Sequence, residues 1–225
     1  MGQEIDIDQI VLHVEETLSK LYGFSLFSTV NNHLVSREQL KTYLGPSIEA
    51  IPEYQSRAGV FICNDRSEED IFIGVHVDEG LRKHLKGDSP LKAVHLDNLD
   101  SFWVLIEEIS HFHLIINRLM RNKEVTKLEL EWQGEIDKIL VSSLTLIAQN
   151  GSPCLEELQI LLHETCSITS EKELENLYND ANRLAARFWR KIMKKKHPLE
   201  TGSIKLFREF YWAPWAYKYS KLSRV

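Results

Sequence analysis

Long apolar runs are missing from this sequence of 225 residues, and so are the usual signs of export. No run approaches the ~20 apolar residues that a helix needs to cross a bilayer. The first residues, MGQEIDIDQIV, are acidic and contain no apolar signal-peptide core. We therefore expect no membrane partner and a cytoplasmic location.

Cysteine is scarce, and several common catalytic signatures are absent. The three cysteines, Cys63, Cys154 and Cys166, are odd in number and show no C-x-x-C spacing, so we expect reduced thiols. The chain has no G-x-S-x-G, P-loop or G-x-G-x-x-G, which argues against hydrolases with a nucleophile elbow, nucleoside triphosphatases and dinucleotide-binding enzymes. A ferritin-like di-metal bundle needs an E-x-x-H on each of two helices, and only one is present.

The remaining pattern predicts an α+β fold. Composition is globular, with 43% hydrophobic and 27% charged residues. Apolar residues at helical spacing predict helices over residues 5–21, 37–44, 78–85, 102–121, 123–149, 155–164, 171–195 and 203–222, the last interrupted at Pro214. Apolar runs of strand type cover residues 24–30, 59–63 and 70–77, and the last two predict an antiparallel hairpin. We expect a small antiparallel sheet packed on a mainly helical body, residues 1–200, followed by a helical C-terminal extension, residues 201–225.

The central predicted helix, residues 102–121, carries polar residues where its pattern requires burial. It reads FWVLIEEISHFHLIINRLMR and is apolar on almost every face, with Asp97, Asp100 or Ser101 as candidate caps. Glu107, Glu108 and His111 share one face, because they are separated by three and four residues. Ionised carboxylates inside a protein cost several kcal/mol unless they are paired, hydrogen-bonded or bound to metal.

The next helix adds two more acids on an otherwise apolar line, Glu131 and Glu135. Gly134 lies between them, at a cost of about 1 kcal/mol relative to Ala, which indicates that another backbone or a ligand approaches closely there. A metal site is one interpretation. Its ligands would be Glu107, His111 and a downstream glutamate, a donor set that suits zinc, manganese or iron.

In that interpretation Glu108, next to the ligands, is a general base that takes a proton from water. The alternative is a polar cluster without a cofactor, neutralised by arginines such as Arg118. His113 lies ~200° around the helix from His111 and cannot share an ion with it. His76 and His95 could join the site from a strand or a loop.

A hairpin, then a buried helix with E-x-x-H, then a helix with acids resembles the layout of zincin-type metallopeptidases, nearest to the intracellular ImmA/IrrE-like group. The resemblance covers residues 60–146. By position it implies that Glu108 is the catalytic glutamate, His111 the second histidine ligand, and Glu131 or Glu135 the downstream ligand. Glu107 stands in place of the first motif histidine. The resemblance therefore implies a protein hydrolase that uses zinc or another divalent metal, or a degenerate site without activity.

The C-terminal segment supports a second hypothesis, a non-catalytic regulatory or adaptor protein. Residues 183–225 hold twelve Lys and Arg against two acids, whereas residues 1–182 hold 15 against 31. Aromatic residues alternate with these cations, a mixture that is typical of partner-docking surfaces and of single-strand nucleic-acid binding. A protein partner is favoured over nucleic acid, through Trp189, Arg208, Tyr211, Trp212 and Trp215. The open alternative is that the aromatic residues close the core and the basic tail lies on the acidic body.

Overall fold

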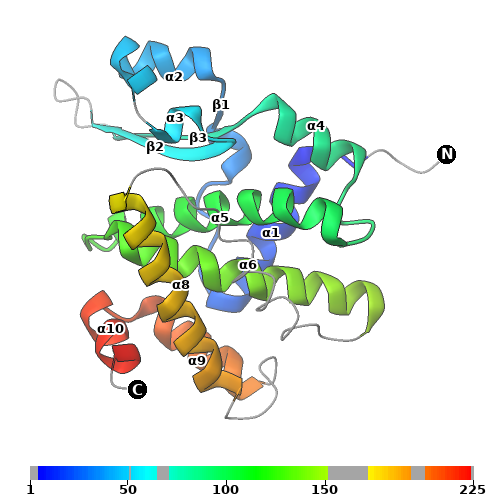
Figure 1. Cartoon of the computed structure of the whole chain (residues 1–225), viewed down its shortest axis with the longest axis vertical. Helices are drawn as coiled ribbons and strands as arrows, with labels where there is room; N and C mark the ends of the chain where they lie inside the picture. Colours follow the sequence, from blue (N-terminus) through cyan, green and yellow to red (C-terminus); the bar gives the residue numbers. More distant parts are fainter. Residues whose placement is uncertain (1–4, 51, 65–70, 152–171, 194–200, 224–225) are drawn as a thin grey trace.

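The computed structural model describes residues 5–50, 52–64, 71–151, 172–193 and 201–223. Its elements are α1 (Ile7–Tyr22), η1 (Val30–His33), β1 (Leu34–Val35), α2 (Arg37–Leu44), η2 (Pro46–Ala50), α3 (Pro52–Gln55), β2 (Ala58–Asn64), β3 (Ile71–Val77), α4 (Glu79–Gly87), α5 (Leu96–Leu119), α6 (Lys127–Asn150), α8 (Lys172–Met193), α9 (Thr201–Trp212) and α10 (Trp215–Ser223). These elements are mainly helical and include one small sheet, so the predicted α+β class is confirmed (Figure 1). None of the described helices combines the length and the apolar character needed to span a membrane.

The first helix, α1, forms for reasons that its sequence makes plain. The Asp6 side chain accepts from the N–H of Gln9, and the Gln9 side chain accepts from the N–H of Asp6, which together form a capping box. The Asp6 side chain also accepts from the N–H of Ile7. Gly23 ends the helix in the left-handed region at φ 68°, which a residue with a side chain adopts at a cost. The apolar face of α1 is buried in the main core, as its spacing predicted.

The sheet has the order β1-β3-β2. β2 and β3 pair antiparallel along their whole length, which confirms the predicted hairpin. The prediction of a purely antiparallel sheet was incomplete, because the short strand β1 pairs parallel to β3. Gly74 makes this pairing possible: a Cβ there would lie 2.9 Å from Cγ2 of Val35 and 2.9 Å from the ring of Phe72.

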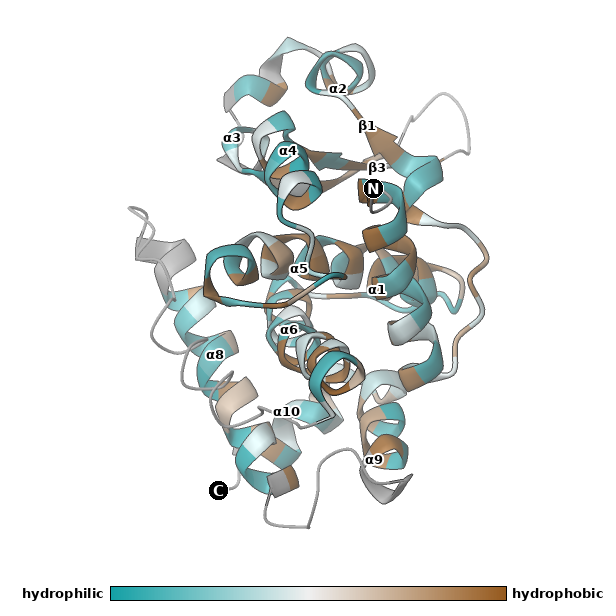
Figure 2. Cartoon of the chain, turned by 90° about the vertical axis from the view of Figure 1, so that its right-hand side faces the viewer, coloured by the Kyte–Doolittle hydropathy of each residue, from teal (hydrophilic) through white to brown (hydrophobic). Residues whose placement is uncertain are grey.

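The sheet separates two apolar clusters. The smaller lies against α2, η2 and α3 and comprises Val35, Leu40, Ile48, Tyr54 and Phe61. On the other side α5 passes beneath the sheet, with α6 beside it and α1 and α8 packed against this pair (Figure 1). The apolar faces of these helices turn toward one another and form the main core (Figure 2). The polar residues of α5 and α6 therefore meet inside the protein, near the sheet.

Several predicted boundaries were wrong. The central helix begins at Leu96 rather than Phe102, so Asp97, Asp100 and Ser101 lie within it and do not cap it. Asp100 and Ser101 instead contact the guanidinium of Arg57. The N–H of His95, at the actual start, donates to Oδ1 of Asn98 at 3.1 Å.

Residues 24–30 form no strand, although they are apolar. Phe24 is buried, and its carbonyl accepts from the hydroxyl of Ser19, so this segment packs on the core without a partner strand. α6 begins at Lys127 rather than 123, because the Thr126 hydroxyl caps it by accepting from the N–H of Glu129 at 3.1 Å. The helix predicted over 155–164 lies outside the described residues.

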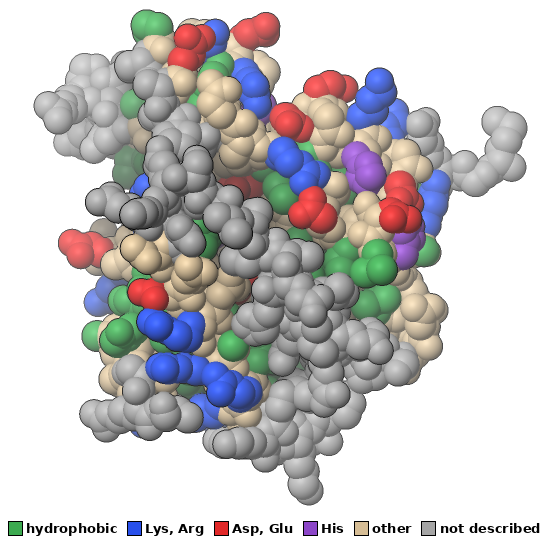
Figure 3. Space-filling view, in the orientation of Figure 1, with side chains coloured by type: hydrophobic (Ala, Val, Ile, Leu, Met, Phe, Trp, Pro, Cys, Tyr) green, Lys and Arg blue, Asp and Glu red, His purple; other side chains and the backbone are tan. Residues whose placement is uncertain are grey.

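The C-terminal helices α9 and α10 are separated at Pro214, as predicted. Their side chains Phe207, Phe210, Tyr211 and Leu222 belong to the same core as α1, α5 and α6. The proposed division at residue 200 stays a prediction. Basic side chains gather on the surface over α8 and α10 (Figure 3). Arg187 and Lys191 of α8 donate to the carbonyls of Leu222 and Lys221 at the end of α10, where positive charge is favourable.

Candidate metal centre

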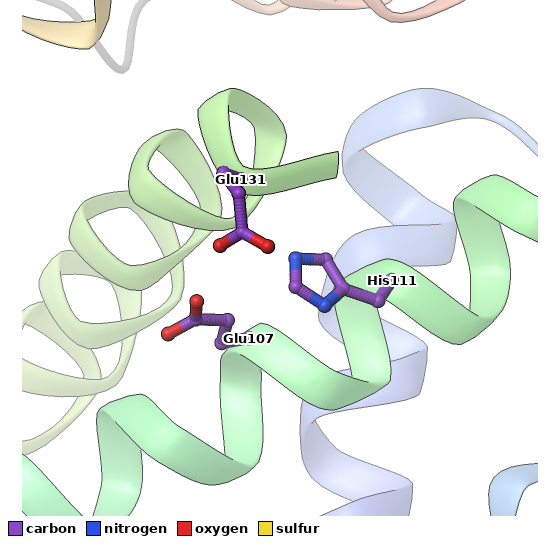
Figure 4. A group of neighbouring side chains, drawn as sticks. All are labelled: Glu107, His111 and Glu131. Carbon is purple, nitrogen blue, oxygen red and sulfur yellow. The ribbon is translucent and has the colours of Figure 1, made fainter. Parts of the chain in front are cut away.

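Glu107, His111 and Glu131 converge at the contact between α5 and α6. Glu107 and His111 lie one turn apart on α5, and Glu131 faces them from the first turns of α6 (Figure 4). One ligand atom from each residue lies within 4.8 Å of the others. Two carboxylates and one imidazole at this separation are a donor set that fits a divalent ion of the zinc, manganese or iron type.

A glycine creates the space at this point. A Cβ on Gly134 would lie 3.3 Å from Nε2 of His111 and 3.1 Å from Cγ of Glu107, closer than side chains normally pack. Gly134 is buried in the middle of α6, where glycine is unfavourable by about 1 kcal/mol relative to Ala. A close approach is therefore present at this position, but it is made by side-chain atoms of the candidate metal-binding residues rather than by another backbone or a bound ligand.

Two of the converging atoms lack partners. Nε2 of His111 and Oε2 of Glu131 are buried and make no hydrogen bond among the described residues. His111 is only 8% exposed, so bulk water does not compensate its ring nitrogen. Since buried polar atoms are nearly always paired, orphaned atoms that face one another across a glycine gap fit the requirements of a bound cation.

Glu108 does not face the three converging residues. Its Oε2 lies 3.7 Å from Nδ1 of His111, on the other side of the ring, at ion-pair distance. A carboxylate near Nδ1 favours the tautomer with the proton on that nitrogen, which leaves the Nε2 lone pair free for a metal. Glu108 also lines the adjoining pocket, and its role as a base stays a prediction.

The structure separates the two candidate downstream ligands. Glu131 belongs to the converging group, whereas Oε1 of Glu135 accepts from Nζ of Lys138 at 2.7 Å. The same ammonium donates to Oε2 of Glu107 at 3.1 Å. Lys138 is the residue that sequence reasoning missed. Its only signal was a lysine three residues after Glu135, within the apolar run of α6.

The charges of the group are strongly coupled. Burial by itself lowers the pKa of His111, but the carboxylates of Glu108, Glu131 and Glu107 outweigh it and raise that pKa to about 10. Burial raises the pKa of Glu131 to about 8; the charge of His111 opposes this rise and that of Glu107 adds to it. For Glu107, burial is overcome by Lys138 and His111, and its pKa is lowered. Without an ion, the site thus retains protons that a cation can replace.

A pocket of about 310 Å³ opens beside the group. It is bordered by the N-terminal part of β2 and by residues of α5, α6 and α8, namely Ser56, Ala58, Gly59, Val60, Glu107, Glu108, His111, Ile115, Lys127, Leu130, Glu131, Leu177 and Tyr178. In the described part of the chain β2 pairs with β3 alone, so no strand pairs with its other edge. The candidate metal centre therefore adjoins a pocket that β2 borders.

Other residues that the sequence suggested for the site have partners elsewhere. Arg118 does not neutralise the group; its Nη2 donates to Glu129 at 2.7 Å. His113 pairs with the buried carboxylate of Glu15 at 2.9 Å. His76 contacts Arg37 and the carbonyl of Val35. His95 pairs with Asp88.

Of the five predicted partner-binding residues, two are buried, two are half-buried and one is exposed. Trp189 and Tyr211 are 1% and 2% exposed and belong to the main core. Arg208 donates to the carbonyls of Leu21 and Lys20 at the end of α1, and the indole of Trp212 donates to the carbonyl of Tyr22. Trp215 packs against Trp132. These contacts support the interpretation that the aromatic residues close the core.

The site thus combines two convergent carboxylates, an imidazole with a free ring nitrogen and an adjoining pocket. Such an arrangement can hold one divalent ion and present it to a molecule in the pocket. No family model matches the chain, and comparisons with curated proteins and with solved structures found no match.

Proposed function

We propose that the chain is a zincin-like protein that binds one divalent ion, zinc or a metal of similar chemistry, through Glu107, His111 and Glu131, and that it hydrolyses a peptide bond. The observation that carries the proposal is the unpartnered Nε2 of His111, which faces two carboxylates across the gap at Gly134. The pocket and the tautomer favoured by Glu108 support it.

The chemistry divides among a few groups. A bound divalent ion supplies a Lewis acid that polarises a carbonyl and makes water a better nucleophile. Glu108 accepts the proton that the attacking water loses and returns it to the amine that leaves. Nδ1 of His111, beside the same carboxylate, keeps the ring oriented with Nε2 toward Glu107 and Glu131.

An extended peptide is the substrate that the pocket suits. Residues 58–60 of β2 border the pocket, and in the described part of the chain no strand pairs with the second edge of β2. An extended segment can add to such an edge by main-chain hydrogen bonds. Ile115, Leu130 and Leu177 add apolar surface, so an apolar side chain next to the cleaved bond is favoured.

The metal site is tested by plasma mass spectrometry of the purified protein, after dialysis against zinc. We expect about one equivalent of zinc, and a melting temperature that falls when a chelator removes it. His111→Ala should lose the metal. His84→Ala, which replaces an exposed histidine on α4, is the matched control and should keep it. A wild-type protein that takes up no divalent ion overturns the proposal.

Catalysis is tested separately, with Glu108→Gln and a quenched-fluorescence peptide library. Because glutamine cannot accept the proton, cleavage should fall by about 10²–10⁴-fold while the metal content stays near one equivalent. If the wild-type protein holds the metal and cleaves no peptide in the library or protein added to it, the hydrolase assignment fails and the metal assignment stands.

A further inference from the structure

The last helix, α10, has an inverted surface pattern. It buries Lys218 completely, whereas Tyr217 and Tyr219, the residues on either side of it, are 49% and 47% exposed. A surface helix normally turns its aromatic residues inward and its lysines toward water. Exposed rings beside a buried lysine therefore indicate that this face of α10 has a use other than closing the core.

A buried ion pair fixes this orientation of α10. Nζ of Lys218 donates to Oε1 of Glu129 on α6 at 2.8 Å, and Arg118 of α5 donates to the same oxygen at 2.7 Å. The loss of one partner from a buried ion pair is strongly destabilising. A rotation of α10 about its axis would withdraw Lys218 from Glu129, so the contact keeps Tyr217 and Tyr219 on the surface.

Cations lie beside the exposed rings. Nζ of Lys221, one turn after Tyr217, is 5.3 Å from the centre of that ring. On the adjoining helix α8, Arg187 and Lys191 donate to carbonyls at the end of α10, and Arg190 is exposed. Neither α10 nor the second half of α8 contains an acid, and Lys and Arg side chains gather on the surface over both helices (Figure 3).

Repeated negative charge together with flat rings is the chemistry that fits this surface. Single-stranded nucleic acid offers both, because its phosphates pair with Lys and Arg and its bases stack on exposed aromatic rings. An acidic protein segment would match the charge alone, and lysine is depleted in protein interfaces. An anionic membrane is bound by helices that insert large apolar side chains, and the only large side chains of this kind that α10 exposes are Tyr217 and Tyr219.

We propose that α10 and the second half of α8 form a surface that binds single-stranded nucleic acid. Tyr217 and Tyr219 stack on bases. Four cations contact phosphates, namely Arg187, Arg190, Lys191 and Lys221. This surface lies at the opposite end of α8 from the pocket, which Leu177 and Tyr178 line, so the inference does not depend on the proposed hydrolase activity.

The charge is tested by fluorescence anisotropy with the full chain and a labelled single strand of about 20 thymidine nucleotides, longer than a typical binding site. Each neutralised phosphate of a single strand contributes about −0.7 to the slope of log affinity against log salt concentration, so four cations predict a slope of about −3. Arg190→Gln/Lys221→Gln should weaken binding at low salt at least about tenfold and make the slope shallower by about 1.4. Lys83→Gln/Lys92→Gln removes two exposed cations elsewhere, on α4 and in the loop after it, and should change neither quantity.

The rings are tested with Tyr217→Ala/Tyr219→Ala. Loss of stacking should lower the affinity at least about tenfold and leave the salt slope unchanged, whereas Tyr217→Phe/Tyr219→Phe keeps the rings and should bind like the wild type. Circular dichroism checks the folding of each variant. If the alanine variant does not fold, Arg190→Gln/Lys221→Gln carries the test, because both of its side chains are exposed.

Three outcomes overturn the inference. The wild type could fail to bind the strand at low salt, or a folded alanine variant could bind as tightly as the wild type. In the third, polyglutamate or vesicles of phosphatidylcholine and phosphatidylserine bind as tightly as the strand, which would assign the surface to an acidic protein or to a membrane. None of these results bears on zinc binding, so the metal centre stands or falls by its own tests.

Discussion

At the scale of single residues, His111 is the most informative side chain of the protein. Its two ring nitrogens have different surroundings: Nδ1 lies beside Glu108, and Nε2 faces Glu107 and Glu131 without a hydrogen bond. In the absence of an ion the surrounding carboxylates raise its pKa to about 10, and burial raises that of Glu131 to about 8. Metal and protons therefore compete for the same atoms.

This competition predicts a steep pH dependence of zinc binding. Below pH 8 both His111 and Glu131 must lose a proton before they coordinate, so acid weakens binding, and affinity should rise at least ~10-fold per pH unit between pH 6 and 8. Competition with a chelator of known proton affinity measures this at each pH. Affinity that is flat over the range would show that these two groups are not ligands.

Part of the site followed from the sequence alone. The i, i+4 spacing placed Glu107 and His111 on one face, and Gly134 in a helix indicated a close approach; both features are present. The choice between Glu131 and Glu135, and the part played by Lys138, did not follow. They depend on how α6 is rotated about its axis relative to α5, which the packing of both helices decides.

At the scale of elements, the centre depends on how closely α5 and α6 approach. Gly134 sets this distance locally, because any other residue would place a Cβ atom here, and that atom would contact His111 and Glu107. Polar contacts further along fix the same pair of helices, such as the hydroxyl of Ser110, which donates to Asp137 at 2.5 Å. The buried polar residues of α5 and α6 thus help to fix the position of one helix relative to the other.

Gly134→Ala tests the gap. The added methyl group would occupy the space in front of Nε2, and zinc affinity should fall at least ~10-fold, while the gain in helix propensity of about 1 kcal/mol limits the loss of stability. Titration calorimetry and urea unfolding in the presence of chelator measure the two effects. Gly80→Ala, on the exposed start of α4 where a Cβ would meet only Asp78 at 3.4 Å, is the control. Equal zinc affinity in both variants would contradict the model of the gap.

The elements that the sequence predicted well are those with strong local signals. Apolar residues at helical spacing and the two apolar runs of strand type placed α1, α2, β2 and β3 nearly correctly. β1 was missed because two residues carry no periodicity, and its pairing depends on the room left by Gly74. Residues 24–30 were assigned to a strand because short apolar runs occur both in strands that pair within a sheet and in irregular segments that pack on the core.

At the scale of the whole molecule, the C-terminal helices are part of the core. Phe207, Phe210 and Tyr211 are buried with α1 and α8, and Tyr22 stacks on Tyr211 at 4.1 Å. A buried charge network adds to this packing: Glu129 accepts from Arg118 and from Lys218 of α10. Arg118 also donates to the carbonyls of Tyr211 and Ala213.

Removal of residues 201–225 should therefore unfold the chain rather than release a tail. The truncation exposes several large apolar side chains, each worth ~1.5–3 kcal/mol of burial, and leaves Glu129 without Lys218, a loss that exceeds typical domain stability. Near-ultraviolet circular dichroism and urea unfolding measure it, with a chain that ends at Ser223 as the control. A truncated protein with native spectra and cooperative unfolding would show that residues 201–225 are a separable extension.

The 22-residue helix α8 has contacts at both of its ends that matter for access. Near its start Leu177 and Tyr178 form one wall of the pocket, and near its end Arg187 and Lys191 hold the last turn of α10. A change that displaces α10 would consequently remove support from the same helix that forms a wall of the pocket.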